Sequence, residues 1–244
     1  GAIDFAGGLV VHMSSGFSAL VAAIMLGKRR GFGREPMPPH SLPLCLIGAG
    51  LLWVGWFGFN AGSALSATPL AALALLNTST AASMAVLVWA VIEWMHRGKP
   101  TALGAATAAV AGLVAITPAC GNVSPMGAIA IGFGVSVICY CAVTFVKPML
   151  GYDDSLDAFG VHGLGGTWGA LATGLFATSL GSGIETNAQQ VMVQLKSIGF
   201  TALYAPAVTF VVLYGLKLTL GLRVADEDEY EGLDVSQHSE SAYS

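Results

Sequence analysis

Seven stretches of the chain are long, apolar and almost free of charged side chains, and they limit the fold more than any other feature. A helix crosses a bilayer core with about 20 apolar residues, and only 10% of the 244 residues are charged, against roughly 25% in a soluble domain. The stretches cover residues 5–27, 42–65, 68–92, 101–117, 124–147, 158–180 and 196–220. We predict an all-α membrane protein with seven transmembrane helices and exclude a water-soluble globule.

The basic residues indicate how these helices are oriented. Nine of the ten lysines and arginines fall on one face, and Lys196 is the exception. Because cytoplasmic loops carry the excess of lysine and arginine, this face is predicted to be cytoplasmic. The N-terminus is then outside, residues 1–220 form a transmembrane domain, and residues 221–244 form a cytoplasmic tail. No basic stripe is left over to indicate a nucleic-acid partner, so the lipid bilayer is the expected surrounding.

An internal repeat relates the start of the first span to the start of the sixth. Residues 4–22 and 154–172 align at a constant offset of 150. The identical pairs are Asp4/Asp154, Val11/Val161, His12/His162, Gly16/Gly166 and Ala22/Ala172. Aspartate and histidine are rare inside membrane spans, which gives their repetition weight. Since five crossings separate the copies, the two helices run in opposite directions, as in the inverted repeats of many transporters.

Each copy places a histidine eight residues after an aspartate. At 1.5 Å per helical residue this is a depth of about 12 Å, close to half of a hydrocarbon core about 30 Å thick. His12 and His162 enter from opposite faces and are therefore predicted to meet near the midplane. The alternative is that each is a neutral core histidine, hydrogen-bonded to a neighbour.

Three aspartates lie at predicted helix starts. The side chains of Asp4, Asp154 and Asp157 can cap free backbone N–H groups there, and this structural role is preferred to direct contact with a cation. In the second span, Trp56 and Phe59 suit packing as well as a binding site. The four cysteines have no metal-ligand spacing, and we predict neither a metal nor a cofactor.

Further sequence features distinguish between the possible classes of membrane protein. A retinal-binding receptor needs a lysine deep in its last span, whereas Lys217 lies six residues before Arg223 and is expected to reach the cytoplasmic interface. No HExxH helix indicates a metalloprotease, and no recognisable setting activates Ser14 or Ser15 as a nucleophile. We therefore predict that the protein is not an enzyme. Transport or channel conduction comes first, and a membrane sensor or a non-transporting receptor is the alternative.

Several strings of the sequence closely resemble one family of membrane proteins. They are GAIDFAGGLVVH, GKRRGFGRE, WVGWFGFNAGSA, AGLVAITPACG, DAFGVHGLGG, LGLRV and EYEGLDVSQHSESAY, and they run through the whole chain. The family is that of the bacterial ammonium transporters, relatives of the Rhesus proteins. The resemblance implies eleven spans, built as two inverted five-span repeats and a final helix, in a homotrimer of the inner (plasma) membrane. The seven spans would then be the fifth to the eleventh, with four further spans expected before them.

The resemblance also implies a pore with named residues. Ammonium, or methylammonium as its analogue, is recruited and deprotonated at the outer mouth by residues that correspond to Phe59, Ser63, Trp56 and Asp4. Among these, Asp4 is expected to support the pore rather than to bind the cation. His12 and His162 correspond to a twin-histidine pair, past which ammonia and the proton cross a hydrophobic pore separately.

The acidic tail has two interpretations. The resemblance implies that it couples the subunits, around Gly232, Leu233 and Asp234, and that a trimeric signalling protein of the PII type closes the pore from the cytoplasm. Without the resemblance, the run DEDEYEGLDV at residues 226–235 is typical of a solvated acidic surface. The sequence leaves open whether this member transports ammonium or senses it.

Overall fold

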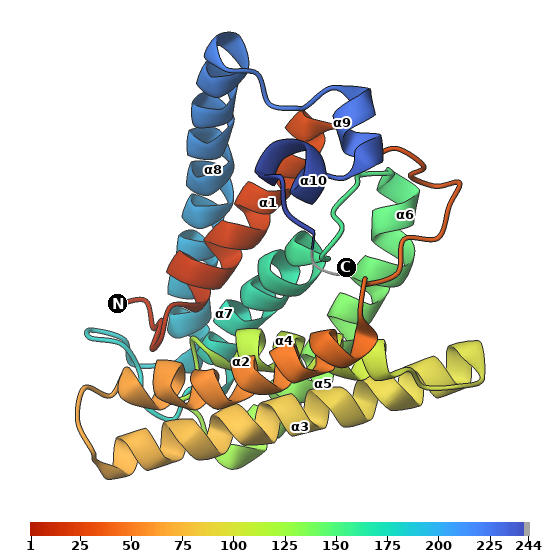
Figure 1. The fold of residues 1–244 in the computed structure, drawn as a ribbon. Helices are drawn as coiled ribbons and strands as arrows, with labels where there is room; N and C mark the ends of the chain where they lie inside the picture. The colour runs from red at the N-terminus through yellow and green to blue at the C-terminus, as the bar shows by residue number, and fades with distance from the viewer. Residues whose placement is uncertain (242–244) are drawn as a thin grey trace.

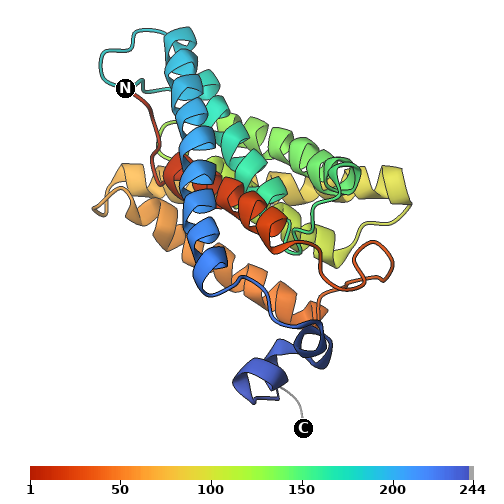
Figure 2. The same ribbon diagram turned by 90° about the horizontal axis from the view of Figure 1, so that it is seen from above.

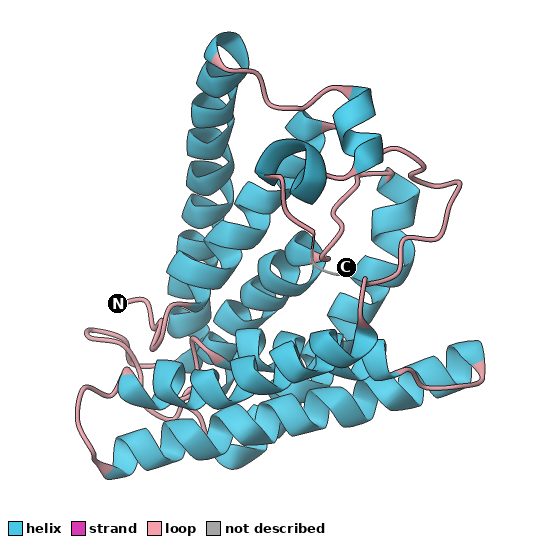
Figure 3. Cartoon of the chain, viewed as in Figure 1, coloured by secondary structure: helices cyan, strands magenta, loops and turns pink. Residues whose placement is uncertain are grey.

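The computed structural model of the chain describes residues 1–241, and residues 242–244 of the predicted tail lie outside the described residues. Its helices are η1 (Gly8–Met13), α1 (Ser14–Leu26), α2 (Leu42–Gly62), α3 (Pro69–Arg97), α4 (Ala102–Ile116), α5 (Pro125–Cys141), η2 (Ala142–Val146), α6 (Lys147–Leu150), η3 (Phe159–Gly163), α7 (Leu164–Phe176), α8 (Asn187–Thr219), α9 (Asp226–Glu231) and α10 (Leu233–His238). The η segments are π-helical turns continuous with the helix that follows. Apart from one isolated bridge between Val123 and Ala177, residues 1–241 contain no strand (Figure 3).

The helices lie where the apolar stretches predicted them. Among the described residues, five helical segments are long and apolar enough to cross a membrane, namely residues 8–26, 42–62, 69–97, 125–150 and 187–219. Two shorter segments, α4 and the continuous helix of η3 and α7, lie at the predicted fourth and sixth spans. The all-α membrane fold predicted from the sequence is confirmed.

Hydroxyl side chains and prolines begin the helices. The Oγ atoms of Ser41, Thr101, Ser124 and Thr186 accept hydrogen bonds from backbone N–H groups in the first turns of α2, α4, α5 and α8. Prolines stand in the first turn of α2, α3 and α5, where the missing N–H breaks no helical hydrogen bond. Gly98 ends α3 with a φ of 80°, a conformation that strongly favours glycine.

The last long helix begins earlier than the sequence predicted. The predicted seventh span begins at residue 196, but α8 begins at Asn187. Gln190 and Gln194 are fully buried, and Gln194 accepts from the N–H of Ile3 at 2.9 Å and donates to its carbonyl at 2.8 Å. Because the glutamine amides bond to protein backbone instead of water, a polar segment can form a buried helical face that hydropathy does not reveal.

The third helix also continues past its predicted end at residue 92. Glu93 is buried, and its carboxylate accepts hydrogen bonds from the N–H of Thr101 at 2.7 Å and from the Oγ1 of the same residue at 3.0 Å. A Cβ atom on Gly104 would lie 2.5 Å from this carboxylate, so glycine leaves the room that it needs. The carboxylate of Glu93, one residue past the predicted end, is therefore held by hydrogen bonds within the α3–α4 hairpin.

The long helices form two groups, α2 to α5 and α1, α7 and α8, which contact each other mainly where α7 packs on α4 and α5. Figure 1 shows α2 and α3 side by side along one edge, with α4 and α5 packed on α3, and α1, α7 and α8 leaning together above them. Figure 2 shows α8 lying across α1. A Cβ atom on Gly132 of α5 would lie 2.4 Å from the carbonyl of Ala81, and one on Gly169 of α7 would lie 2.3 Å from that of Ala115. Small residues thus let the helices of both groups approach backbone to backbone.

Candidate functional site

The two copies of the internal repeat begin their helices in the same way. Asp4 Oδ2 accepts hydrogen bonds from the backbone N–H groups of Leu9 and Val10, at 3.0 and 3.3 Å. Asp154 Oδ2 accepts one from the N–H of Phe159, again five residues further on, at 2.8 Å. Each carboxylate therefore caps the wide first turn of its helix, η1 or η3, and satisfies N–H groups that have no partner within the helix.

Asp157 does not act as the cap that the sequence predicted. Its φ is 55°, and its carboxylate forms an ion pair with the ammonium group of Lys147 instead of bonding to the first turn of η3. Lys147 also donates to the carbonyl of Asp154 at 3.0 Å. The lysine thus ties the end of the α5–η2–α6 helix to the start of η3, and Asp157 supports that helix start by an ion pair.

The capped helices cross with their backbones in contact. A Cβ atom on Gly16 would lie 2.0 Å from the backbone nitrogen of Gly163, and one on Gly166 would lie 3.0 Å from that of Met13. Because Gly16 and Gly166 are equivalent in the repeat, the crossing is nearly symmetrical. It brings the two repeat histidines into contact through their Nδ1 atoms.

His12 and His162 are in contact, in agreement with the meeting predicted from the repeat. Their Nδ1 atoms lie 3.3 Å apart and their ring centroids 5.3 Å apart. One hydrogen shared between the Nδ1 atoms makes one ring the donor and the other the acceptor, so the two Nε2 atoms have opposite roles. The Nε2 atom of His12 is buried and has no hydrogen-bond partner among residues 1–241. It is therefore available to a small molecule.

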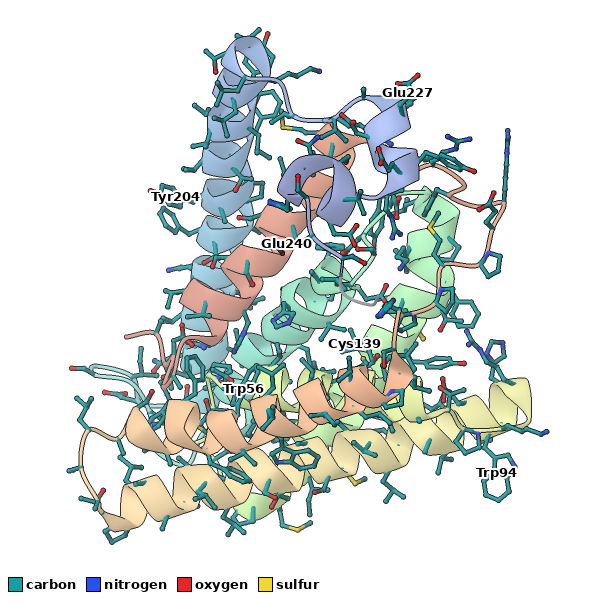
Figure 4. All side chains as sticks on the ribbon, viewed as in Figure 1. Trp56, Trp94, Cys139, Tyr204, Glu227 and Glu240 are labelled. Carbon is teal, nitrogen blue, oxygen red and sulfur yellow. The ribbon has the colours of Figure 1, made fainter. Side chains whose placement is uncertain are left out.

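Two aromatic side chains of α2 cover one side of His12. The indole of Trp56 stacks on the imidazole with ring centroids 5.0 Å apart and planes 18° apart. Phe59 lies 5.9 Å from His12 and 5.7 Å from Trp56, measured between ring centroids. Figure 4 labels Trp56 on the side of α2 that faces α1 and α7. The indole N–H donates to Thr117 Oγ1 at 3.0 Å, so Trp56 presents a ring face, rather than a donor, to His12.

Each histidine lines its own cavity. A cavity of about 530 Å³ is bounded by His12, Trp56, Phe59 and apolar residues that include Leu52. A second cavity of about 300 Å³ is bounded by His162 and mainly by apolar residues, and Leu52 lines this one as well. The site therefore offers imidazole nitrogens between two mostly apolar spaces. Such an arrangement can pass a small polar molecule or a proton and holds no activated nucleophile.

Residues 1–243 match the sequence model of the Ammonium Transporter Family. The chain belongs to this family. The ammonium transporter Amt1 of Archaeoglobus fulgidus is 49% identical over 248 residues, a match that covers all of this chain and 63% of Amt1. An ammonium transporter of Aquifex aeolicus is also 49% identical, over all of this chain and 57% of its own length. The chain thus spans about three fifths of the curated relatives that it matches. The family consists of transporters rather than enzymes.

Solved structures give the same assignment. The structure described as Sensor Amt Protein superimposes with a TM-score of 0.91 at 34% identity, over 97% of this chain and 60% of that one. The crystal structure of Mep2 from Saccharomyces cerevisiae superimposes with a TM-score of 0.84 at 37% identity, over 93% of this chain and 55% of that one. The fold of the Ammonium Transporter Family is thereby confirmed for this chain.

The residues expected at the outer mouth lie in two places. Ser63 follows Phe59 by one helical turn and donates its hydroxyl hydrogen to the Phe59 carbonyl at 2.8 Å. Trp56 and Phe59 contact His12, as described above. Asp4 lies at the start of η1, and within residues 1–241 no hydrogen bond joins its carboxylate to Ser63. The structure thus groups the aromatic residues with the histidines and places Asp4 at a helix cap.

The tail contacts the loop between α1 and α2. Glu229 accepts from the N–H of Arg30 at 2.9 Å and pairs with Arg223 at 2.5 Å, and the Arg30 guanidinium lies 4.4 Å from the ring centroid of Tyr230. We call these four residues the tail clasp. The expected coupling segment Gly232–Asp234 lies directly after it, at the break between α9 and α10, where Gly232 has a φ of 107°.

A second ion pair holds the same loop. Arg29 donates to both carboxylate oxygens of Asp153, at 2.9 and 2.7 Å, and its backbone N–H donates to this carboxylate at 2.8 Å. The side-chain hydrogen bonds from Arg29 lower the pKa of Asp153 below its ordinary value. The loop after α1 is therefore fixed to the segment before η3.

Four residues of these contacts were not predicted from the sequence, namely Thr117, Arg29, Glu229 and Tyr230. Thr117 stands in the string AGLVAITPACG, but nothing in that string shows that its partner is an indole 61 residues earlier. Glu229 and Tyr230 lie in the acidic run, and Arg29 in the basic run at residues 28–34, so opposite charge was the available signal. That signal indicates attraction between the two segments and does not identify the pairs.

Proposed function

We propose that the protein carries ammonium across the membrane, and that neutral ammonia and a proton pass the pair His12 and His162 separately. The observation that carries the proposal is the contact of two histidines from opposed repeat helices, each lining a cavity. Relatives at 49% identity are named ammonium transporters, which supports the substrate. Deprotonation is favoured because a full charge in an apolar cavity is far more costly than a small neutral amine.

Recruitment takes place on α2. Phe59 and Trp56 present aromatic faces, which attract a cation within about 6 Å of the ring centroid. The Ser63 hydroxyl has donated its hydrogen to the Phe59 carbonyl, which leaves oxygen lone pairs to accept hydrogen bonds from ammonium. Phe59 is 40% exposed and lines the cavity at His12, a position suited to a gate. Asp4 contributes by capping the helix that carries His12.

The histidine pair relays the proton. A proton taken up at one Nε2, passed across the Nδ1–Nδ1 hydrogen bond and released from the other Nε2 reverses the tautomers of both rings. Ammonia finds the same Nε2 atoms as an acceptor and a donor. Asp154 and Asp157 hold the start of the helix that carries His162, through the cap and through the ion pair with Lys147.

Current measurements on the intact protein in liposomes test this function. An ammonium gradient should drive a saturable current, with slower uptake of labelled methylammonium, while an equal potassium gradient should drive none. A folded protein that gives neither ammonium current nor methylammonium uptake contradicts transport.

An ammonium sensor of the same fold is the second candidate. The similar structure described as Sensor Amt Protein and the contact between the tail and the first loop favour it. A sensor, or another non-transporting receptor, should show ammonium-dependent hydrogen exchange at residues 223–238 without any ammonium current. Current and exchange measured on one preparation separate the two functions.

Family membership and the charge pattern support a proposal for the wider architecture. The protein is a homotrimer in the plasma membrane, with residues 1–220 as the transmembrane domain and residues 221–244 as the cytoplasmic tail. The contact of Arg30 with Tyr230 supports a common side for the first loop and the tail. Reporter fusions after Ser182 and after the last residue should give opposite signals, and equal signals contradict this topology.

A PII-type signalling protein binds at the cytoplasmic face, and the tail couples the subunits through Gly232, Leu233 and Asp234. The position of this segment directly after the tail clasp supports a role in transmission. Deletion of all residues after Arg223 from the intact protein should abolish cooperation between subunits and alter inhibition by the PII-type protein. Unchanged transport and unchanged inhibition would reduce the tail to solvated surface.

A further inference from the structure

We propose that Thr117 is a positioning residue: it holds the indole of Trp56 flat on His12 and so keeps the Nε2 atom of His12 free for the permeating molecule. The inference deepens the proposed function and rests on it. Thr117 follows α4 directly, its side chain is fully buried, and its hydroxyl joins α4 to α2.

The hydroxyl of Thr117 has a fixed place and a fixed role. It donates its hydrogen to the carbonyl of Leu113, one turn back in the helix, at 2.8 Å. It can therefore act only as an acceptor toward Trp56, whose Nε1–H reaches it at 3.0 Å. Because indole is a donor only, this bond uses the whole hydrogen-bonding capacity of the Trp56 side chain.

Loss of this acceptor would leave the indole N–H unpaired on the ring that stacks against His12, whose Nε2 is an acceptor in the tautomer that donates from Nδ1 to His162. His12 Nε2 is buried without a partner, on the ring against which Trp56 stacks at a centroid distance of 5.0 Å. Unpaired buried donors and acceptors are costly, so the indole would tilt toward His12. The tilt would occupy the nitrogen that ammonia needs and would narrow the cavity of about 530 Å³ that both rings line.

The backbone at Thr117 also helps to position His12, the residue on which the Trp56 indole stacks. Its carbonyl accepts from the N–H of Ala6 at 3.2 Å, and the carbonyl of Pro118 accepts from the N–H of Phe5 at 3.0 Å. These bonds hold the segment that leads into η1, the turn that carries His12. The segment of Thr117 and Pro118, directly after α4, therefore sets the position of His12 and of the indole that covers it.

Three variants of the intact protein test the inference. Thr117→Val replaces the hydroxyl by a methyl group of similar size, and Thr117→Ser retains the hydroxyl. Thr173→Val is the matched control, because Thr173 is also fully buried and donates to the carbonyl one turn back, that of Gly169, at 2.8 Å. If Thr117→Val does not fold, Thr117→Ala removes the same hydroxyl without adding an apolar group.

The indole N–H resonance reports the bond directly. The protein has five tryptophans, so labelling with ¹⁵N-tryptophan gives few signals, and Trp56→Phe identifies the one from Trp56. Thr117→Val should move this resonance, while Thr117→Ser and Thr173→Val should leave it in place. An unmoved resonance in Thr117→Val overturns the inference, whatever the protein transports.

Flux measurements show whether the position of the indole matters for transport. Thr117→Val should lower the ammonium current about tenfold, the equivalent of about 1.4 kcal/mol, and should lower methylammonium uptake more strongly because the cavity narrows. In a Trp56→Phe background Thr117→Val should add no further loss, since the donor is already gone. Equal losses for both substrates, or an undiminished loss in the Trp56→Phe background, make Thr117 merely structural and overturn the inference. Absence of current in the unaltered protein would instead contradict the proposed function, and the resonance would still decide the role of Thr117.

Discussion

The histidine site and the tail clasp hold polar groups by opposite means. At the histidine site, Asp4 bonds to backbone N–H groups, His12 bonds to His162, and Trp56 bonds to a hydroxyl. At the tail clasp, Arg223 pairs with the carboxylate of Glu229, and the guanidinium of Arg30 lies over the ring of Tyr230. Both arginines are exposed to solvent. One region relies on hydrogen bonds between buried or partly buried groups and the other on charges near water.

The difference follows from the solvent around each region. An unpaired charge in an apolar interior is very costly, so most polar groups of the histidine site have fixed partners. Among the described residues of the site, the Nε2 atom of His12 and the Oδ1 atom of Asp4 have none. Near water, ion pairs are screened and contribute little, but they form and break easily. The comparison therefore predicts large, sharp effects at the histidine site and small, salt-dependent effects at the tail clasp.

The largest effect should come from removing the pair His12 and His162. Replacing both by alanine in the intact protein removes the polar path between the two cavities, and the ammonium current should fall by about two orders of magnitude, comparable to the loss of a general acid–base group. If the pair were only core packing, a single replacement would instead cost about 1–3 kcal/mol of stability by leaving its partner unpaired.

Current and thermal unfolding measured on the same purified variants separate these readings. Full ammonium-selective current in a folded double variant would show that the histidines only pack. The histidine site would then differ from the tail clasp in structure but not in a role in transport.

The next effect should come from the helix crossing. Gly16→Ala places a methyl group 2.0 Å from the backbone nitrogen of Gly163, which forces α1 and α7 apart and should destabilise the protein by about 1–3 kcal/mol. Gly50→Ala is the control, because a Cβ atom on Gly50 of α2 meets nothing within 4 Å. Denaturant unfolding of both variants measures the difference, and equal stabilities contradict the close crossing.

The histidine contact was open to prediction from the sequence because it depends on regular geometry. A repeat with fixed offset and a constant rise per residue was enough to place His12 beside His162. The start of α8 was predicted wrongly, because the burial of Gln190 and Gln194 depends on a segment far away in the sequence. Likewise, the bond from Trp56 to Thr117 requires that α2 and α4 already lie side by side. A contact set by the repeat and the helical rise was predictable, whereas contacts set by packing alone were not.

A smaller effect with a defined pH dependence should come from the pair Arg29 and Asp153. The pKa of Asp153 is lowered by the hydrogen bonds from Arg29, so the folded state holds the carboxylate charged more strongly than the unfolded state does. The resulting stability, at most about 1 kcal/mol because the Arg29 side chain is partly exposed to solvent, is complete above the unfolded pKa of about 3.9. It is lost as the pH falls through the lower, folded value.

Asp153→Asn should therefore lower the unfolding temperature at pH 7, and the gap to the unaltered protein should narrow as the pH falls below about 4. Asp226→Asn, at an exposed residue of the tail, should give no gap at either pH. A gap for Asp153→Asn that stays constant with pH would mean that packing, and not the charge pair, holds the loop.

The smallest effect should come from the tail clasp itself. Glu229→Gln keeps an oxygen for the N–H of Arg30 but removes the charge that pairs with Arg223, and the loss in global stability should stay below about 1 kcal/mol. Local opening is a separate equilibrium, so hydrogen exchange should become faster at residues 223–238 and 28–34 and remain unchanged at η1 and η3.

Salt and a neighbouring residue make this last test specific to the charge at Glu229. Raising the salt from about 0.1 M to about 1 M shortens the screening length from about 10 Å to about 3 Å, so the unaltered protein should come to exchange as fast as the Glu229→Gln variant. Glu227→Gln removes a charge of the same sign two residues earlier, at an exposed position, and should change nothing. Faster exchange at η1 in Glu229→Gln would show that the clasp and the histidine site open together, because a local event at the tail could reach η1 only through a shared cooperative unit. The two regions would then be one structural unit, and the charges near water would help to hold the buried hydrogen bonds.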